Sequence, residues 1–414
     1  MKKFRISIFI LMILSAACVV PACGDGNDNG TPPATTQPPE DVVITIGNHT
    51  DKTGVASNAL KYIDMAMKDS VQYYNENNLI PGVHVKLIEY DGQADPSRDI
   101  TGYKWLKERG ADVITAWFPS VATTLRPFIN SDGIPLFGTI VGKEIMYPPG
   151  YLFLTNTLLE NTAWTMIKWL AGNHWDYESN GPARIGGVCW ETDDCGAYFG
   201  AIKQYAELHP EQIEWVSGHI VAVSTFQWTY EVEALKDCDY IWVPNIMGTF
   251  VKAYKDAGYS AVFLGSDNHL AFWRLIGDMR IWDELDGTLF ISTSEWWDDE
   301  GELIDLIKEL VDKYHPNSVE EIRSAGKSYI AVGNALMVLE IIKSAAETVG
   351  PENLDSEAIY QAAQSFTMTI DGLDRYSFTE EKRTAVDYLV IYEADGEAED
   401  LVRISDWMPV ESPP

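Results

Sequence analysis

DVITAWFPSVATTLRPFINSDGIPLFGTIVG, residues 112–142, is the stretch that decides the fold. Its first five residues, 112–116, form a short apolar run that is typical of a buried parallel strand. The Pro-Ser pair at 119–120 predicts a helix start, because proline costs little where amides lack partners and serine can cap them. The Asp-Gly pair at 132–133 ends that helix, and 134–137 has the composition of a second strand. The stretch therefore predicts a strand-helix-strand unit.

This unit also predicts where a small molecule binds. In open parallel sheets, ligands bind beyond the carboxyl ends of the strands, where free amides at helix starts attract polar or anionic groups. Residues 118–121 and 139–142 follow two neighbouring strands and should therefore lie side by side. We expect a small-molecule site at these two strand ends.

The same alternation of strands and helices extends over most of the chain. Strands are expected at 42–46, 83–90, 184–189, 213–221, 240–243, 261–264 and 289–292. Helices are expected at 60–74, 97–109, 158–175, 195–208, 228–235, 249–257, 302–314, 329–349 and 356–366. We interpret 47–57 as a polar loop, 329–349 as a helix buried between other elements, and 386–392 with 401–404 as an antiparallel pair. Such alternation predicts an α/β fold with two doubly wound parallel sheets.

Composition limits the classes of function. With 414 residues, of which 46% are hydrophobic and 22% charged, the chain can bury large cores and should divide into two lobes. The formal charge of -32 opposes binding to nucleic acid or to an anionic membrane surface. The seven histidines show no metal-ligand spacing, so we expect no metal and no cofactor.

The N-terminus has the features of an export signal. Lys2, Lys3 and Arg5 precede the apolar run 6–17, which is too short to span a bilayer comfortably. Cys18 and Cys23 each follow small residues, as in the bacterial lipobox, whose cysteine is lipidated. Cys18 fits that pattern better, whereas Cys23 lies closer to the linker; cleavage without a lipid is the alternative.

We interpret 1–23 as a signal peptide with a lipobox and 24–41 as a disordered tether, because 24–41 has almost no apolar side chain. No other segment is expected to cross a membrane. The protein should therefore be extracytoplasmic and lipid-anchored to the bacterial cell membrane, in the periplasm or on the outer surface.

Few residues indicate covalent chemistry. Phosphate loops, nucleophile elbows and dinucleotide fingerprints are absent from the sequence, which disfavours an enzyme. Cys189 and Cys195 bracket a short segment of an exported chain, so a disulfide between them is chemically permitted, but two buried thiols are the favoured alternative. Cys238 is not expected to pair with either.

Tryptophan is abundant, with 14 residues. Most should be core, but four lie where strands end and loops begin: Trp117, Trp190, Trp296 and Trp297. Aromatic rings at strand ends can stack on a ligand, and core packing is the alternative for each of them.

The order and spacing of several short motifs then become informative together. They are Thr53-Gly54, Tyr74-Asn75-Glu76, Tyr90-Asp91, Asp95-Pro96, Gly133-Ile134-Pro135, Tyr151-Leu152-Phe153, Ala257-Gly258 and Gly265-Ser266-Asp267. In this order the chain resembles the type I periplasmic binding proteins of the branched-chain amino acid (leucine-binding-like) family, which are substrate-binding lipoproteins of ABC transporters.

The resemblance implies two lobes joined by three crossovers, here near Thr157, Thr293 and Tyr376. Lobe 1 would comprise 42–157 and 294–375, and lobe 2 would comprise 158–293 and 376–414. It also implies that the loops 118–120 and 140–142 hold a ligand carboxylate, that Asp267 holds an ammonium group, and that Cys195 covers the ligand. The expected ligand contacts are Trp117, Phe118, Ser120, Ile140, Gly142, Trp190, Cys195, Asp267 and Trp296.

Several positions depart from the family pattern, among them Trp117-Phe118, which is bulkier than the usual lining. Pro119 and Gly142 stand where hydroxyl residues usually bind the carboxylate, and Cys195 stands where an aromatic residue is common. We therefore do not expect an unmodified branched-chain amino acid as the ligand.

The expected function is capture of a small organic solute for the permease of an ABC transporter. The solute should be an amino acid or a related compound, aromatic or not. The protein should be a monomer without enzymatic activity. Two alternatives remain: a ligand sensor for a membrane receptor, and a secreted hydrolase that uses Asp91, Glu191 or Asp267.

Overall fold

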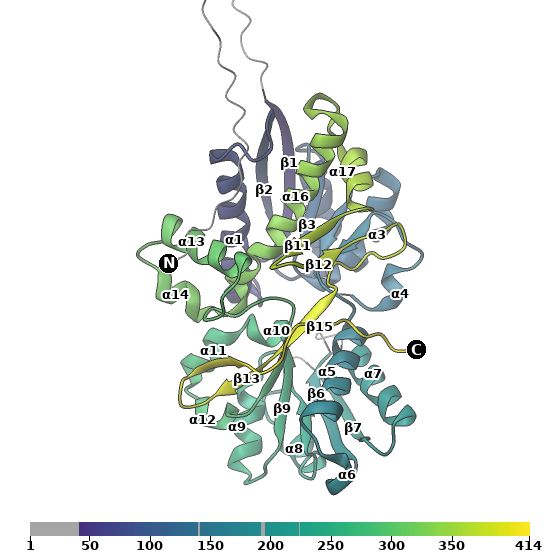
Figure 1. The fold of residues 1–414 in the computed structure, drawn as a ribbon, viewed down its shortest axis with the longest axis vertical. Coiled ribbons are helices and arrows are strands. Elements are labelled where there is room, and N and C mark those ends of the chain that lie inside the picture. Colours follow the sequence, from purple (N-terminus) through teal and green to yellow (C-terminus); the bar gives the residue numbers. More distant parts are fainter. Residues whose placement is uncertain (1–40, 140, 192–194, 223) are drawn as a thin grey trace, which may run out of the picture. The chain divides into compact units, whose positions relative to one another are not determined.

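The computed structural model describes residues 41–414, except residues 140, 192–194 and 223. Its first sheet is parallel throughout, with the strand order β2-β1-β3-β4-β5 (Figure 1). The strands are β1 (Val42–Thr50), β2 (Val83–Asp91), β3 (Val113–Ala116), β4 (Leu136–Gly138) and β5 (Leu152–Leu154). The strand-helix-strand unit is confirmed as β3, α3 (Pro119–Asp132) and β4. Gly133 ends α3 in the left-handed conformation, with a φ of 68°.

Both faces of the first sheet are covered by helices. Val113 and Phe137 belong to an apolar cluster that includes residues of α1 (Ser57–Glu76) and α16 (Val332–Val349). Their neighbours Ile114 and Leu136 belong to a second cluster, formed with α2 (Asp99–Lys107) and α3. Because successive side chains of a strand point to opposite faces, even these short strands contribute to two cores.

The second sheet has the order β14-β13-β10-β9-β8-β6-β7, and β15 pairs with β13. Its strands are β6 (Ala183–Trp190), β7 (Ile213–Val221), β8 (Tyr240–Trp242), β9 (Val262–Ser266), β10 (Leu289–Ser292), β13 (Tyr388–Asp395), β14 (Asp400–Arg403) and β15 (Met408–Pro409). Strands β6 to β10 are mutually parallel, whereas β13 and β14 are antiparallel, as predicted for the C-terminal pair.

The helices expected around the second sheet are present. They are α5 (Leu159–Asn173), α7 (Cys195–Leu208), α8 (Thr229–Ala234) and α9 (Gly248–Asp256). Three further helices between β9 and β10 were not expected: α10 (Asp267–Leu270), α11 (Trp273–Met279) and α12 (Trp282–Leu285). Helices this short span too few turns to display a periodic apolar stripe, so the sequence pattern does not reveal them.

The chain passes between the two sheets three times. It leaves the first sheet after β5, and after β10 it returns to α13 (Glu302–Tyr314), which packs against α1. After β12 (Leu373–Ser377) it enters β13, which pairs with β10. The fold is therefore two α/β lobes joined by three crossovers. The exact lobe limits given above stay a prediction.

The most apolar helix lies in the core. The helix expected at 329–349 consists of α15 (Lys327–Ile330) and α16. Residues Lys327–Val349 are long and apolar enough to cross a membrane, contrary to our expectation that no segment beyond the N-terminus would be. The window that meets this criterion is 72% buried, and α16 packs against α1 and α17 (Ser356–Ala363). It is thus a core helix, as its all-round apolar composition indicates.

The main error in the element prediction is at the end of β1, which continues to Thr50 instead of turning into a loop at residue 47. Its polar residues are buried, and Asn48 is paired on both sides: it donates to Asp64 Oδ1 at 2.8 Å and accepts from Thr115 at 3.1 Å. In a sequence, such a run of polar residues is typical of a loop, and the partners that keep it in a buried strand are not visible.

The remaining elements are short and were not individually predicted. They are η1 (Pro96–Arg98), α4 (Lys143–Met146), α6 (Tyr177–Asn180), α14 (Val319–Ser324), η2 (Pro351–Asn353) and β11 (Thr367–Ile370), which pairs with β12. Helix 97–109 was expected as one piece, but η1 precedes α2 there, and Asp95 accepts from the Ser97 amide at 2.9 Å as expected of a cap.

Candidate ligand-binding site

The predicted contacts in lobe 1 begin at the carboxyl end of β3. Trp117 is buried, and its indole Nε1 has no hydrogen-bond partner among the described residues. Phe118 is half-buried and packs against both apolar clusters of the first sheet. A buried donor without a partner is costly, so an acceptor that reached Trp117 Nε1 would remove that cost.

Ser120 lies in the first turn of α3 but does not cap it. The N-cap residue is Phe118, and no side chain caps the helix. The Ser120 hydroxyl instead donates to Asp99 Oδ2 at 3.4 Å. The expectation of a serine cap was wrong, because Ser120 is the second residue of the helix, past the N-cap position of Phe118, and its hydroxyl is bound to Asp99 on α2. The α3 amides therefore lack a side-chain acceptor.

Two buried ionisable groups lie beneath Ser120. His49 Nε2 is 4.0 Å from Asp99 Oδ1, and both side chains are 2% exposed. Burial lowers the pKa of His49 to about 4, so the imidazole is neutral. Burial likewise raises the pKa of Asp99, while Thr124 and Ser120 oppose that shift by hydrogen bonding. The His49 ring is therefore neutral, and the Asp99 carboxyl group is engaged by the Ser120 hydroxyl.

The second predicted strand end is only partly described. Ile140 lies outside the described residues. Gly142 precedes α4 as its N-cap, and a Cβ atom added there would lie 2.7 Å from a Glu144 carboxylate oxygen. The next amide, of Lys143, donates to Glu160 Oε1 at 3.2 Å.

In lobe 2, the ends of β6, β8, β9 and β10 lie along one edge because these strands are parallel neighbours. Trp190 ends β6 and is buried; its Nε1 donates to the Thr225 carbonyl at 3.0 Å, and its ring packs against Phe226 and Trp228. Most of its indole is thus engaged by the loop that follows β7.

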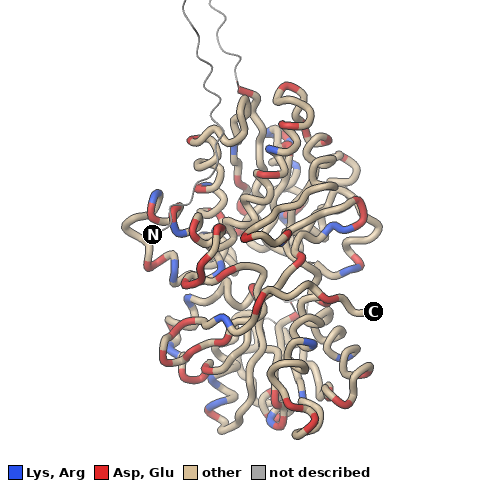
Figure 2. The backbone as a smooth tube through the Cα atoms, viewed as in Figure 1, with Lys and Arg blue, Asp and Glu red and all other residues tan. Residues whose placement is uncertain are grey.

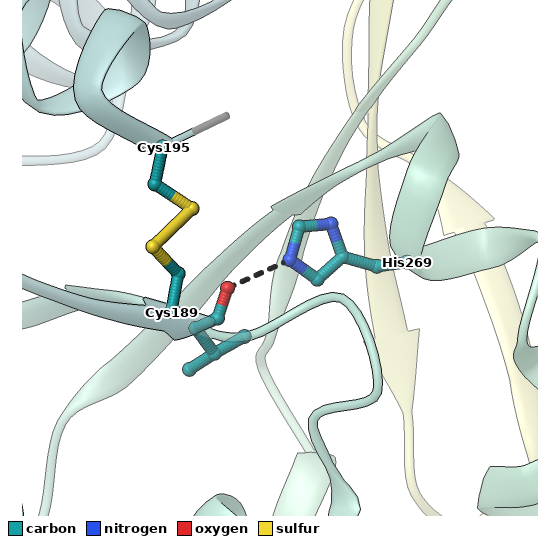
Figure 3. Close-up of a disulfide and its surroundings, with 4 residues drawn as sticks. Cys189, Cys195 and His269 are labelled. Atoms are coloured by element: carbon teal, nitrogen blue, oxygen red, sulfur yellow. Dashed lines mark hydrogen bonds between the residues drawn. A yellow bond between two sulfur atoms is a disulfide. The ribbon is translucent and has the colours of Figure 1, made fainter. Parts of the chain in front are cut away.

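Cys189 and Cys195 are joined by a disulfide, with a Cα–Cα distance of 6.4 Å (Figure 3). The preference for two free thiols was wrong. The segment between them is short enough to bring the end of β6 to the start of α7, and the two sulfur atoms meet there. Cys195 therefore anchors a loop, and Cys238 is a free, buried cysteine.

His269 lies near this disulfide and is directed at the strand ends (Figure 3). Its Nδ1 accepts from the Ser266 amide at 2.9 Å, and its Nε2 lies 2.9 Å from the Val243 carbonyl. Because a backbone amide can only donate, Nδ1 carries no proton and Nε2 donates to Val243. Complete burial lowers the pKa of His269 to about 4. The neutral ring fastens the loops after β8 and β9 together.

Asp267 follows β9, and only one of its two carboxylate oxygens, Oδ2, accepts hydrogen bonds from the described residues. Its Oδ2 accepts from the Thr293 amide at 3.1 Å and from the Thr293 hydroxyl at 2.6 Å. Its Oδ1 lies 3.3 Å from Lys327 Nζ. Lys327 is on α15, which packs against both α1 and α10. Burial lowers the pKa of Lys327, and Asp267 opposes that shift.

Trp296 is the predicted contact least available to a ligand. It is buried, its Nε1 donates to Asp400 at the start of β14, and its ring packs against Trp273 at 5.3 Å. Trp297 is similar: its Nε1 donates to the Gly326 carbonyl at 3.0 Å. Both indoles serve packing in this structure.

The structure does not bring Asp91, Glu191 and Asp267, the acids of the hydrolase alternative, into one site. Asp91 accepts from Lys52, Thr53 and Gln93 of its own loop region. Asp267 is paired with Lys327, and Glu191 is exposed. Within the described residues, no group of three or more His, Cys, Asp or Glu is placed to hold a metal ion. Two surface hollows, around Asp286 and Glu393 and around Asp374 and Asp387, include none of the predicted contacts.

A model of one protein family, described as periplasmic binding protein, matches residues 43–399. The chain belongs to the periplasmic binding protein family. Membership gives it a substrate-binding role and an extracytoplasmic location, as expected. Curated protein sequences contain no match to this periplasmic binding protein.

Solved structures share its fold. A branched-chain amino acid ABC transporter protein from Thermus thermophilus with bound valine is 20% identical, with a TM-score of 0.75 over 89% of this chain and 97% of the other. A fatty acid ABC transporter substrate-binding protein from Thermomonospora curvata is 18% identical, with a TM-score of 0.72 over 89% and 93%. A solute-binding protein from Rhodopseudomonas palustris BisB5 with 3,4-dihydroxybenzoic acid is 15% identical, with a TM-score of 0.71 over 90% and 99%.

Sequence reasoning missed Lys327, the cation next to Asp267. Sixty residues of chain separate the two, and Lys327 lies just before the apolar segment that was expected to begin a helix at residue 329. The polar residues around Lys327 gave no periodic signal.

Proposed function

We propose that this periplasmic binding protein captures a small organic solute between its two lobes and delivers it to the permease of an ABC transporter. The observation that carries the proposal is the family match over residues 43–399, which includes strands of both sheets up to β13 and all three crossovers. In such a fold the carboxyl ends of both sheets carry the loops that contact ligands. The protein acts as a monomer and has no enzymatic activity of its own.

The solute carries a carboxylate or another strongly polar acceptor, which binds to lobe 1. Two features support this assignment: the start of α3, which no side chain caps, and the buried Nε1 of Trp117, which has no partner among the described residues. Phe118, which is half-buried, would pack against the body of the solute. The structural neighbours named for valine, a fatty acid and 3,4-dihydroxybenzoic acid all have ligands with a carboxyl group, which is consistent with this chemistry.

Nucleic acid is not a partner in this proposal. Aspartate and glutamate are spread over the helices and loops of both lobes, with lysine and arginine scattered among them (Figure 2). A net charge of -32 would repel a phosphate backbone.

The membrane attachment is a lipid on Cys18 or Cys23, which lie outside the described residues. The support is the export signal followed by two cysteines and the polar tether 24–41. Each buried methylene of an acyl chain contributes about 0.8 kcal/mol, so several chains anchor firmly where one would not. Changing both cysteines to serine should release the protein into the soluble fraction. Unchanged membrane retention would contradict the anchor.

Solute capture predicts closure of the lobes, because three crossovers leave few covalent constraints on their rotation. Small-angle scattering should show a smaller radius of gyration when a saturating solute is present. Identical profiles with and without a solute that calorimetry shows to bind would contradict capture between the lobes.

A further inference from the structure

The C-terminal strap, which we define as residues 405–411, runs along the point where the chain enters the second sheet for the last time. Its strand β15 pairs with Tyr388 and Leu389, the first two residues of β13 (Figure 1). The Val410 amide donates to the Asp387 carbonyl at 2.9 Å, just before β13 begins. The strap therefore binds the third crossover directly.

Both ends of the strap are fastened to elements of the second sheet or to a helix beside it. The Ser405 hydroxyl accepts from the Ile391 amide of β13 at 2.8 Å. At the far end, the Glu411 amide donates to the Thr165 hydroxyl of α5 at 2.9 Å, and Glu411 forms an ion pair with Lys168 at 2.8 Å. Helix α5 follows the first crossover, so the strap also reaches that connection.

Between these ends, Trp407 contacts an element that packs on the first sheet. The centre of its ring lies 3.8 Å from the Arg375 guanidinium of β12, and the same guanidinium forms an ion pair with Glu295. Strand β12 is followed directly by Phe378, whose ring packs against Phe153 of the first sheet at 5.2 Å. A segment fastened beside the second sheet thus contacts a residue anchored beside the first.

This contact is placed to resist rotation of the lobes. The Arg375 side chain is only 1% exposed, and the attraction between a cation and an aromatic face is stronger when the cation is desolvated. Rotation would move β12 relative to the strap, so it must either separate Trp407 from Arg375 or pull the strap from its anchors. The three crossovers alone impose few covalent constraints on that rotation.

We propose that the C-terminal strap restricts the rotation of the two lobes through the contact of Trp407 with Arg375. The inference rests on the proposed function, in which the lobes close on a solute. A protein with a narrow range of lobe orientations has less conformational entropy to lose when it closes. The strap therefore favours solute binding from outside the binding site, and Trp407 is a positioning residue.

The test measures the range of lobe orientations in the emptied protein, without solute. Spin labels are attached at Lys104→Cys on α2 and Lys203→Cys on α7, two exposed positions, in a full-length chain that also carries Cys18→Ser and Cys23→Ser. The labels attach at the introduced cysteines, because Cys238 is buried and the remaining two cysteines form the disulfide. Pulsed electron paramagnetic resonance then gives the distribution of distances between the labels.

Two substitutions at one position separate the aromatic contact from general damage. Trp407→Leu should broaden the distance distribution, because leucine offers no aromatic face to Arg375. Trp407→Phe keeps such a face and should keep the distribution of the parent. Trp215→Leu is the matched control: Trp215 is also partly buried, but it lies on the edge strand β7 and packs against Phe199, so its loss should leave the distribution unchanged.

Hydrogen exchange reports on the crossover itself. The Asp387 amide donates to the Arg375 carbonyl at 2.9 Å and so joins the third crossover to β12. In Trp407→Leu this amide should exchange about 10-fold faster or more, because loss of the buried contact eases local opening. An unchanged exchange rate would contradict the proposal.

A folded Trp407→Leu variant with the distance distribution of the parent would overturn the proposal. If that variant does not fold, Thr165→Val decides, because it removes the acceptor of the Glu411 amide and leaves Arg375 untouched. It should broaden the distribution, and an unchanged distribution would again overturn the proposal. These measurements need no solute. The proposed function fails separately, if the purified protein neither releases nor binds any small organic solute.

Discussion

Arg375 and Glu295 form an ion pair with only 1% and 2% of their side chains exposed. Arg375 Nη2 donates to Glu295 Oε2 at 3.0 Å, and its guanidinium group lies 3.8 Å from the centre of the Trp407 ring. The pair joins the segment after β10 to strand β12, and hence two of the three crossovers. It fixes the chain at the place where the lobes are connected.

Loss of one partner should leave an uncompensated buried charge. Glu295→Gln is expected to lower the free energy of unfolding by about 3 to 5 kcal/mol, measured by urea denaturation. The control is Glu411→Gln, which removes an ion pair with Lys168 whose side chains are 44% and 51% exposed. That change should cost less than about 1 kcal/mol. If both variants lose the same free energy of unfolding, burial does not increase the contribution of the Arg375–Glu295 pair to stability.

His269 should make the protein sensitive to acid. Its pKa is lowered by burial to about 4 in the folded state, from 6.5 in the unfolded chain. The unfolded state therefore binds more protons between these values, and stability is lost as the pH falls from 6.5 towards 4. The loss amounts to roughly 3 kcal/mol for this residue. His49, lowered to about 4, adds to the slope, whereas Asp64, raised by burial to about 6, opposes it.

The measurement is a proton NMR titration of the His269 ring. Its resonances should stay constant from pH 8 to about 5, with the Nε2 tautomer throughout. Titration of His269 near 6.5 would mean that the ring is hydrated and does not fasten the loops after β8 and β9.

The disulfide between Cys189 and Cys195 should stabilise the folded chain. Closing a loop over a sequence separation of 6 contributes about 2 kcal/mol in the chain-entropy model. Replacing both cysteines with serine should lower the free energy of unfolding by that amount. Alkylation of the folded protein should modify neither residue until a reductant is added, whereas alkylation without reductant would show that the thiols are free.

Trp117→Phe tests the unpartnered indole at the end of β3. Phenylalanine retains most of the apolar contact but removes the Nε1 donor, which has no partner in the described structure. We expect solute affinity to fall about 10-fold, the loss of one hydrogen bond to a charged group, with little loss of stability. The matched control is Trp297→Phe, whose Nε1 donates to Gly326, and which should destabilise the fold without a specific loss of affinity.

Much of the fold could be predicted because its signals are local. Pro119 starts α3 and Gly133 ends it, and the alternating apolar runs place nearly every long helix and strand. The end of β1 was missed because Asn48 and His49 look like loop residues until Asp64 and Asp99 are brought beside them. Helices α10 to α12 are too short for periodicity to reveal.

The site was harder to predict because its chemistry depends on distant pairings. The sequence identified Asp267 as a charged group at a strand end, but gave no sign of Lys327, which neutralises it. The choice between two free thiols and a disulfide at Cys189 and Cys195 depended on where α7 begins. Ser120, Gly142 and the other predicted contacts stay predictions until a ligand is identified.

The most direct test of solute binding is mass spectrometry of the compound that this protein carries when it is purified from its native cells. We predict one small organic solute with a carboxylate or another strongly polar acceptor, which rebinds to the emptied protein with one molecule per chain in calorimetry. A protein that releases no small molecule and binds none from a broad panel of organic solutes would contradict it.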